Sequence, residues 1–408
     1  MLRSHKVRLD PTHAQAQHFA RACGVARFAW NWALAEWQRQ YEASKLDPAL
    51  PRPTEGALRR QLNAIKREQY PWMLEVTKCA PQEAIINLGR AYKNWFDALS
   101  GRRKGPKAQA PRFKRKGERD RFKIHGTVTA IDDSRIRIPN LGWVRMRESL
   151  RFSGRVVSVT VSRTAHAWFA AVTVDAEDVP ARCESQAAVG VDVGVHTLAV
   201  FSDASPPVEG PKALKTLLQR LRRLSRAHSR KAKASANRKK SAQRLARLHW
   251  RIACMRADAL HKPTNRLTRD YAWVAIEDLN VCGMLGNSRL ARHLADASFG
   301  EFRRQLTYKA AMREGTLVVV GRGYPSSKTC SGCGAVNTAR TLSARHWTCT
   351  ICGVTHDRDK NAARNFLARA FVSMNPNTRP VWACRPVERK ALTGGLSGPR
   401  ESVLEEGR

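Results

Sequence analysis

The chain has 408 residues, of which 73 are Lys or Arg and 34 are Asp or Glu, so its formal net charge is +39. This excess goes well beyond what solubility requires and favours a polyanionic partner such as nucleic acid. No run of about 18 apolar residues occurs, which argues against a membrane-spanning segment. The ten cysteines follow no disulfide framework, and this usage is typical of a reducing, intracellular compartment.

The N-terminal region predicts a strand followed by helices. Residues 3–9 read as a short strand, and a helix is expected from residue 12 to 23, with Gly24 separating it from a second helix. Four large side chains recur at helical spacing in that second helix, which favours core packing over base stacking. They are Trp30, Leu34, Trp37 and Tyr41. Further helices are expected over 55–68 and 81–98.

The next segment, 101–123, is basic and broken by Gly and Pro, so it cannot be helical throughout. A run of cations is commonly only solvated surface, but the charge of the whole chain favours contact with phosphates here. The residues expected to make such contacts are Arg112, Lys114, Arg115 and Lys116. From 124 to 176 apolar residues alternate with polar ones, which predicts an antiparallel sheet or small barrel that the strand at 3–9 joins.

An apolar segment at 188–204 predicts two strands, and Asp192 lies within the first. A buried carboxylate is costly unless it is paired, and a metal cation is a suitable partner. A long insertion follows at 211–262, with leucines on helical faces and a basic middle, so we expect an antiparallel pair of helices with a basic tip. The tip offers Arg238, Lys239 and Lys240 to a nucleic-acid backbone, the alternative being a solvated arm.

A further apolar strand, in the segment 271–280, ends in the two acids Glu277 and Asp278. Acids at the carboxyl ends of such strands face the crevice in which open α/β sheets bind ligands. Residues 281–296 are expected to be irregular and mobile. A core helix through Phe299 and Leu306 and a strand at 316–320 follow.

Two CxxC motifs separated by fifteen residues come next, each followed by Gly. Four thiolates arriving as two pairs can surround one Zn²⁺ ion, and a site without an open position is structural. The ligands are Cys330, Cys333, Cys349 and Cys352. Directly afterwards a helix is expected to open at His356 and run to about residue 371. Its first acids, Asp357 and Asp359, could be simple helix caps, unless they converge with Asp192 and Glu277 around divalent cations.

The stretches GVDVGVHTLAVFSD, IEDLNV, the CxxC pair and THDRDKNAARN together resemble the TnpB proteins encoded by insertion sequences. These are RNA-guided DNA nucleases with a RuvC-like domain, similar to the type V CRISPR effectors, and the resemblance covers nearly the whole chain. It implies that Asp192, Glu277 and Asp359 are catalytic and hold two Mg²⁺ ions. Asp359 is preferred to Asp357 because the family's acid directly precedes an xNAA stretch, here residues 360–363.

The resemblance also implies the fold class and the partners. We expect a multidomain α+β protein with an RNase H-like (RuvC) nuclease core interrupted by a zinc ribbon, and an N-terminal oligonucleotide-binding-like barrel interrupted by a helical domain. The partners would be a guide RNA from the transposon end and double-stranded target DNA beside a short motif, with one protein copy per RNA. The location would be the prokaryotic cytoplasm, at the nucleoid. Arg345 is a further expected phosphate contact.

The N-terminal half is expected to form a wedge barrel (1–10 and 124–180) and a helical recognition domain with its linker (11–123). The C-terminal half is expected to form the nuclease core (188–325 and 355–371) with the insertion at 211–262, the zinc module (326–354) and a disordered tail (372–408). Two other functions stay open, a guided DNA-binding repressor that does not cleave and a transposase that joins strands. The second would need a module that reads transposon ends, and no separate helix-turn-helix is evident.

Overall fold

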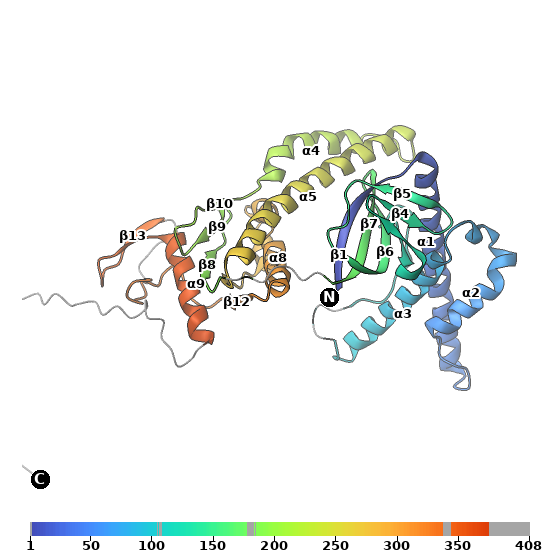
Figure 1. Ribbon diagram of the computed structural model, residues 1–408, viewed down its shortest axis with the longest axis horizontal. Helices are drawn as coiled ribbons and strands as arrows, with labels where there is room; N and C mark the ends of the chain where they lie inside the picture. The colour runs from blue at the N-terminus through green and yellow to red at the C-terminus, as the bar shows by residue number, and fades with distance from the viewer. Residues whose placement is uncertain are drawn as a thin grey trace, which may run out of the picture. The chain divides into compact units, whose positions relative to one another are not determined.

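The computed structural model describes residues 2–103, 105, 108–177, 183, 185–337 and 344–374 (Figure 1). Contacts divide the chain into two compact units, Met1–Ala181 with Leu217–Cys254 (unit 1) and Arg182–Thr216 with Met255–Arg408 (unit 2). The expected linker at 178–187 and the expected tail from 372 lie mostly outside the described residues. None of the helices in those described ranges is long and apolar enough to cross a membrane.

Unit 1 contains a seven-stranded antiparallel sheet in the order β2-β6-β7-β1-β5-β4-β3. The first strand of the chain pairs with β7 and β5, as the sequence predicted for residues 3–9. Alternate residues of that strand are buried, so one face packs on the core. The strands are β1 (Leu2–Asp10), β2 (Arg121–His125), β3 (Ile131–Asp132), β4 (Arg135–Ile138), β5 (Gly142–Met146), β6 (Gly154–Thr164) and β7 (Ala167–Ala176).

Three α-helices of unit 1 interrupt this sheet in the sequence, between β1 and β2. They are α1 (His13–Leu46), α2 (Glu55–Gln69) and α3 (Cys79–Leu99), with the short 3-10 helix η1 (Pro71–Glu75) before α3; a second 3-10 helix, η2 (Gly126–Val128), follows β2. The predicted break at Gly24 is wrong, because α1 continues through it. A glycine costs a helix only about 1 kcal/mol, and its neighbours Cys23 and Val25 are both buried in the core. Trp30 and Leu34 are buried as predicted.

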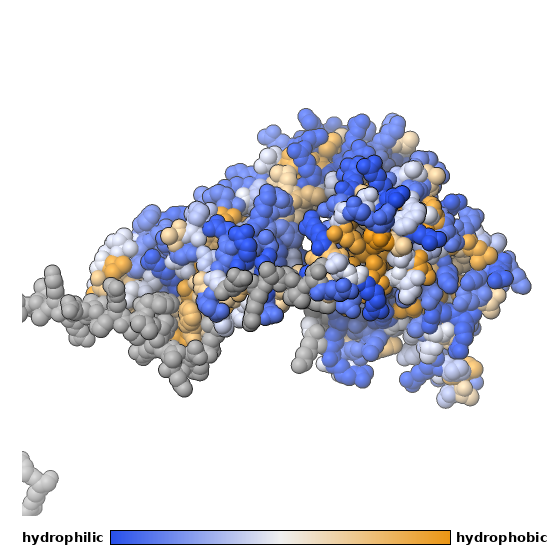
Figure 2. Space-filling view, in the orientation of Figure 1, coloured by the Kyte–Doolittle hydropathy of each residue, from blue (hydrophilic) through white to orange (hydrophobic). Residues whose placement is uncertain are grey.

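The predicted pair of helices is present as α4 (Ala213–Ser229) and α5 (Ala236–Asp270), although α5 runs eight residues beyond the expected end at 262. The Arg238 guanidinium donates to the carbonyls of His228 and Lys231, at 3.2 and 2.8 Å, and so closes the turn between the helices. In Figure 1 the two helices form a hairpin, and Figure 2 shows mostly hydrophilic side chains over them.

Unit 2 is built on a five-stranded sheet in the order β10-β9-β8-β11-β12. The pairs of β11 with β8 and β12 are parallel, and those among β8, β9 and β10 are antiparallel. The strands are β8 (Ala188–Asp192), β9 (Thr197–Phe201), β10 (Val208–Glu209), β11 (Trp273–Glu277) and β12 (Thr316–Val320). The sheet packs against α8 (Phe299–Met312) and α9 (Arg358–Met374), so the strands expected at 188–204, 271–277 and 316–320 are confirmed.

The expectation of irregular structure at 281–296 is wrong. Two short helices, α6 (Val281–Leu285) and α7 (Ala291–Ala297), occupy it. The Asn280 side chain caps α6 by accepting the Gly283 N–H at 3.1 Å, and Leu294 buries the inner face of α7. Helices of five and seven residues are too short to show a period in the sequence.

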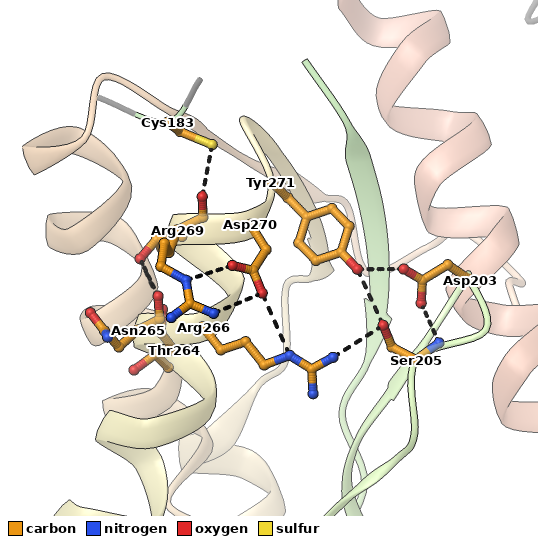
Figure 3. Close-up of polar contacts among 10 residues, drawn as sticks. Cys183, Asp203, Ser205, Thr264, Asn265, Arg266, Arg269, Asp270 and Tyr271 are labelled. Atoms are coloured by element: carbon orange, nitrogen blue, oxygen red, sulfur yellow. Dashed lines mark hydrogen bonds and ion pairs between the residues drawn. The ribbon is translucent and has the colours of Figure 1, made fainter. Parts of the chain in front are cut away.

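A polar network fixes the loop that follows β9 (Figure 3). Asp203 accepts the hydroxyl of Tyr271 and, at 2.9 Å, the backbone N–H of Ser205. The Ser205 hydroxyl lies 3.2 Å from the same tyrosine oxygen. Tyr271 lies between α5 and β11. The network therefore joins the C-terminal end of α5 to the loop between β9 and β10.

Candidate active site and metal centre

Two of the predicted acids lie at the carboxyl end of the sheet of unit 2. Asp192 is the last residue of β8 and Glu277 the last of β11. These strands are parallel neighbours, with Val191 opposite Ile276. Asp192 and Glu277 are the next residues on each strand, so their carboxyl groups are neighbours at the carboxyl end of the sheet.

Helix α9 brings the third acid, because its first turn carries Asp359. The helix crosses β8 very closely. A Cβ placed on Gly190 would meet the Ala363 carbonyl oxygen at 1.8 Å, so only glycine permits this approach. Ala362 and Ala363 are buried on the helix side. A glycine within an apolar strand and a pair of alanines downstream of the acid were the signals that could have predicted this packing.

Asp359 and Glu277 lie close enough to Asp192 to influence its ionisation. Burial, followed by the charges of Asp359 and Glu277, raises the pKa of Asp192 to about 7, against a weaker opposing influence of Arg358. Burial and Asp278 likewise raise the pKa of Glu277. The carboxylates of Asp359 and Glu277 therefore disfavour the ionised form of Asp192, and a cation placed among the three would relieve this repulsion.

Two arginines hold Asp359 in this structure. Arg345 Nη1 lies 3.2 Å from its Oδ2, and Arg358 Nε lies 2.7 Å from its Oδ1. Arg345 was expected to contact phosphate, and here it pairs with an acid of the site. In the described part of the chain, only the four cysteines form a group of three or more Cys, His, Asp or Glu with ligand atoms within 4.8 Å of one another. The three carboxylates do not all lie within that distance of one another.

The other two candidate acids have different partners. Asp357 accepts the backbone N–H groups of Asp359 and Lys360, at 3.1 and 2.9 Å, and thus caps α9. The helix consequently begins at Arg358 and not at His356, which lies with Asp357 in β14 (Thr355–Asp357), paired with β13 (His346–Thr348). Asp278 forms ion pairs with Arg303 and Arg322.

The four cysteines form a compact cluster with the geometry of a zinc site. The Sγ atoms of Cys330 and Cys352 are 3.6 Å apart, and those of Cys333 and Cys349 are 3.7 Å apart. Tetrahedral Zn²⁺ with Zn–S bonds of 2.3 Å places its sulfurs about 3.8 Å apart, so the residues fit this ion. The glycines after each second cysteine, Gly334 and Gly353, have φ of 77° and 72°, which a side chain would strain.

Buried amides attach this cluster to α9. Asn361 accepts the Ser331 N–H at 2.9 Å and donates to the Thr329 carbonyl at 2.8 Å. Asn365, one turn later, donates to the carbonyls of Thr329 and Ser326, at 2.7 Å each. His356 Nε2 lies 3.1 Å from Cys330 Sγ. These roles were not predicted from the sequence, although two asparagines at helical spacing beside a CxxC motif were a usable signal.

The remaining predicted contacts are basic side chains at the surface of unit 1. Five of them are exposed, on the linker or at the start of α5, whereas Lys114 is half-buried and Arg238 closes a turn. The exposed residues are Arg112, Arg115, Lys116, Lys239 and Lys240.

Three family models match the chain. One described as "Probable transposase" covers residues 171–288, one described as "Cas12f1-like, TNB domain" covers 299–366, and one described as "Helix-turn-helix domain" covers 1–45. In the structure the last range contains strand β1 followed by the single helix α1, not two helices joined by a turn.

Relatives and a solved structure align with most of the chain. A "Putative RNA-guided DNA endonuclease" of Streptomyces pristinaespiralis is 34% identical over 99% of this chain and 96% of its own length. The "Putative RNA-guided DNA endonuclease InsQ" of Escherichia coli K12 is 34% identical over 90% and 92%. A Cas12f1 chain, solved in a complex with sgRNA and target DNA, has 15% identity and a TM-score of 0.52, covering 87% of this chain and 83% of that one.

The structural likeness shows a shared α+β fold, and the identity to full-length relatives shows more. Two relatives are each 34% identical to this chain over at least nine-tenths of its length and of their own. They and this protein therefore belong to one family. The chain belongs to the TnpB family, whose bacterial relatives are named as RNA-guided DNA endonucleases.

Proposed function

We propose that the chain is an RNA-guided DNA endonuclease whose unit 2 is a RuvC-like nuclease domain with a two-ion active site. The observation that carries this proposal is the placement of Asp192 and Glu277 at the ends of adjacent parallel strands, with Asp359 in the first turn of the helix that crosses β8. Burial, and then the charges of Asp359 and Glu277, raise the pKa of Asp192 to about 7. The names of the full-length relatives supply the substrate and the guide.

The three acids would hold Mg²⁺, for which carboxylate oxygens are suitable ligands. When bound, such ions activate water and stabilise the leaving oxygen of a phosphodiester. Asp192 and Glu277 are fixed by adjacent parallel strands, whereas Asp359 depends on α9 and on its two arginines. A phosphate could take over the guanidinium of Arg345, which is half-exposed, and so leave Asp359 free for a cation.

The basic surface of unit 1 supports the guided part of the proposal. A guide RNA and its pairing with DNA are recognised through backbone charge and shape, which requires cations more than base-reading side chains. The exposed linker residues Arg115 and Lys116 and the lysines at the start of α5 offer such charge. A guide from the transposon end, a single protein copy per RNA, and the wedge and recognition roles of the expected domains belong to the same proposal.

The test compares neighbouring acids. Asp359→Asn should abolish Mg²⁺-dependent cleavage of matched DNA but leave binding of RNA and DNA nearly intact. Asp357→Asn is the matched control, because asparagine caps a helix as well as aspartate does and should preserve cutting. Equal activity of the two variants would refute the assignment of Asp359. Binding without cleavage by the wild-type protein would favour a repressor, and joining of DNA ends would favour a transposase.

A further inference from the structure

A cavity of about 900 Å³ opens in unit 1 between α1, α3 and the segment that leads into β2. All of its lining residues belong to unit 1, whereas the three acids and the cysteines belong to unit 2. Its volume lies at the upper end of the range for small-ligand sites and is large enough for a nucleotide.

One wall is a piece of irregular chain that α1 holds firmly. The Trp30 indole N–H donates to the Arg112 carbonyl at 3.0 Å. The Asn31 side chain bonds both backbone groups of Lys114, accepting its N–H at 2.8 Å and donating to its carbonyl at 3.0 Å. The composition of this segment indicates a flexible linker, but these bonds hold it in one conformation. Less conformational entropy is therefore lost when the segment binds a ligand.

The cavity carries a surplus of positive charge. Seven cationic side chains and three acidic ones line it. Two of the acids are already neutralised, because Glu83 pairs with Lys123 and His125, and Asp120 pairs with Arg27. Among the described residues, five lining cations have no ion pair with an acid. They are Arg90, Arg112, Lys114, Arg119 and Arg121.

Lys114 is the best placed of these cations. Its ammonium lies 3.4 Å from the centre of the Trp30 ring, so the head group is fixed over an aromatic face. Burial and the nearby charge of Arg121 lower its pKa to about 8. An anion beside Lys114 and Arg121 would compensate both effects.

The cavity also offers groups suited to a base. Phe113, between Arg112 and Lys114, keeps 54% of its surface exposed and presents a ring at the edge. Asn87 lies on the α3 wall of the cavity. Its amide nitrogen donates a hydrogen bond to the Glu83 carbonyl, so its amide oxygen points away from that carbonyl. An exposed ring among cations, with an amide nearby, is the combination that binds unstacked nucleotides.

We propose that this cavity binds a single-stranded segment of nucleic acid, with a phosphodiester against Lys114 and Arg121 and an unstacked base against Phe113. The proposal deepens the proposed function, since it assigns one part of the nucleic acid to a built site. RNA and DNA share this chemistry, and the experiment separates them.

The experiment uses the full-length protein freed of RNA by high salt. Labelled single-stranded RNA and DNA of one sequence, carrying 4-thiouridine or 4-thiothymidine, are titrated by anisotropy without Mg²⁺ and then photocrosslinked and mapped by mass spectrometry. Lys114→Gln is compared with Lys116→Gln, which removes the same charge from an exposed position two residues away. Phe113→Leu removes the ring without changing the charge.

We expect Lys116→Gln to weaken binding about twofold and Lys114→Gln about tenfold, with crosslinks on the peptide that contains Phe113. Phe113→Leu should lose those crosslinks, and its exposed position keeps the test valid if Lys114→Gln fails to fold. Crosslinks with RNA alone, DNA alone or both would each support the site and identify its source. Equal losses for the two lysine variants, or no crosslink near Phe113, would overturn the proposal. Wild-type crosslinks without cleavage activity would refute only the proposed function.

Discussion

Replacing Asn361 by alanine tests whether the zinc module and the helix that carries Asp359 are held together by one side chain. Asn361 is 1% exposed and joins the first cysteine motif, through the Ser331 N–H, to the first turns of α9. Its amide also donates to the carbonyls of Thr329 and Ser326, at 2.8 and 3.3 Å.

The magnitude follows from what the substitution leaves unpaired. Both carbonyls keep a second donor in Asn365, at 2.7 Å each, so they are not orphaned. The Ser331 N–H loses its acceptor, and an unsatisfied buried donor costs about 1–3 kcal/mol. A loss of about 2 kcal/mol corresponds to roughly 30-fold in an equilibrium constant. Asn365→Ala orphans no such N–H and should cost about 1 kcal/mol or less.

Because zinc binding and folding of the module are coupled, the loss should appear in zinc affinity. Chelator competition, followed by the absorbance of a zinc indicator, would measure it on the full-length protein. We expect Asn361→Ala to release zinc about 30-fold more readily, and Asn365→Ala to show a clearly smaller change. Equal zinc affinities for Asn361→Ala and the wild type would refute the reasoning. Slower cleavage should accompany the weaker zinc binding, because Asp359 lies in the first turn of the same helix.

Further predictions concern the carboxyl end of the sheet in unit 2 and its packing against α9. Since burial and two neighbouring acids raise the pKa of Asp192 to about 7, Mg²⁺ must displace a proton below that pH; calorimetry should show affinity rising from pH 6 to 7 and levelling off by pH 8, and a constant affinity would contradict this. Gly190→Ala should lower the unfolding temperature strongly, because its Cβ would meet a carbonyl oxygen at 1.8 Å, whereas Gly300→Ala, with no neighbour within 4 Å, should not. A similar unfolding temperature for both glycine variants would argue against the close crossing of α9 and β8.

Local patterns in the sequence predicted the elements that hold the site. The strands ending in Asp192 and Glu277 were evident because a short apolar run with a terminal acid is a local signal. The break at Gly24 was predicted wrongly because a single glycine is a weak signal that burial on both sides overrides. The short helices α6 and α7 were missed because each has too few residues to show a period.

Contacts between distant residues could not be predicted in the same way. The ion pair of Arg345 with Asp359 depends on how the zinc module returns to α9, which no local pattern encodes. The clamp of Asn31 on Lys114 joins residues 83 positions apart and fixes a segment whose composition indicates a flexible linker. The choice of Asp359 over Asp357 came from the family resemblance, and the structure adds a reason in the helix-capping bonds of Asp357.

The most direct measurement is the sequencing of RNA that copurifies with the protein from cells carrying its native flanking DNA, followed by a Mg²⁺ cleavage assay on DNA matching the variable end of that RNA. We expect one discrete RNA and cutting of matched DNA only. Heterogeneous RNA, or a discrete RNA with binding but no cutting, would contradict the assignment of a guided nuclease.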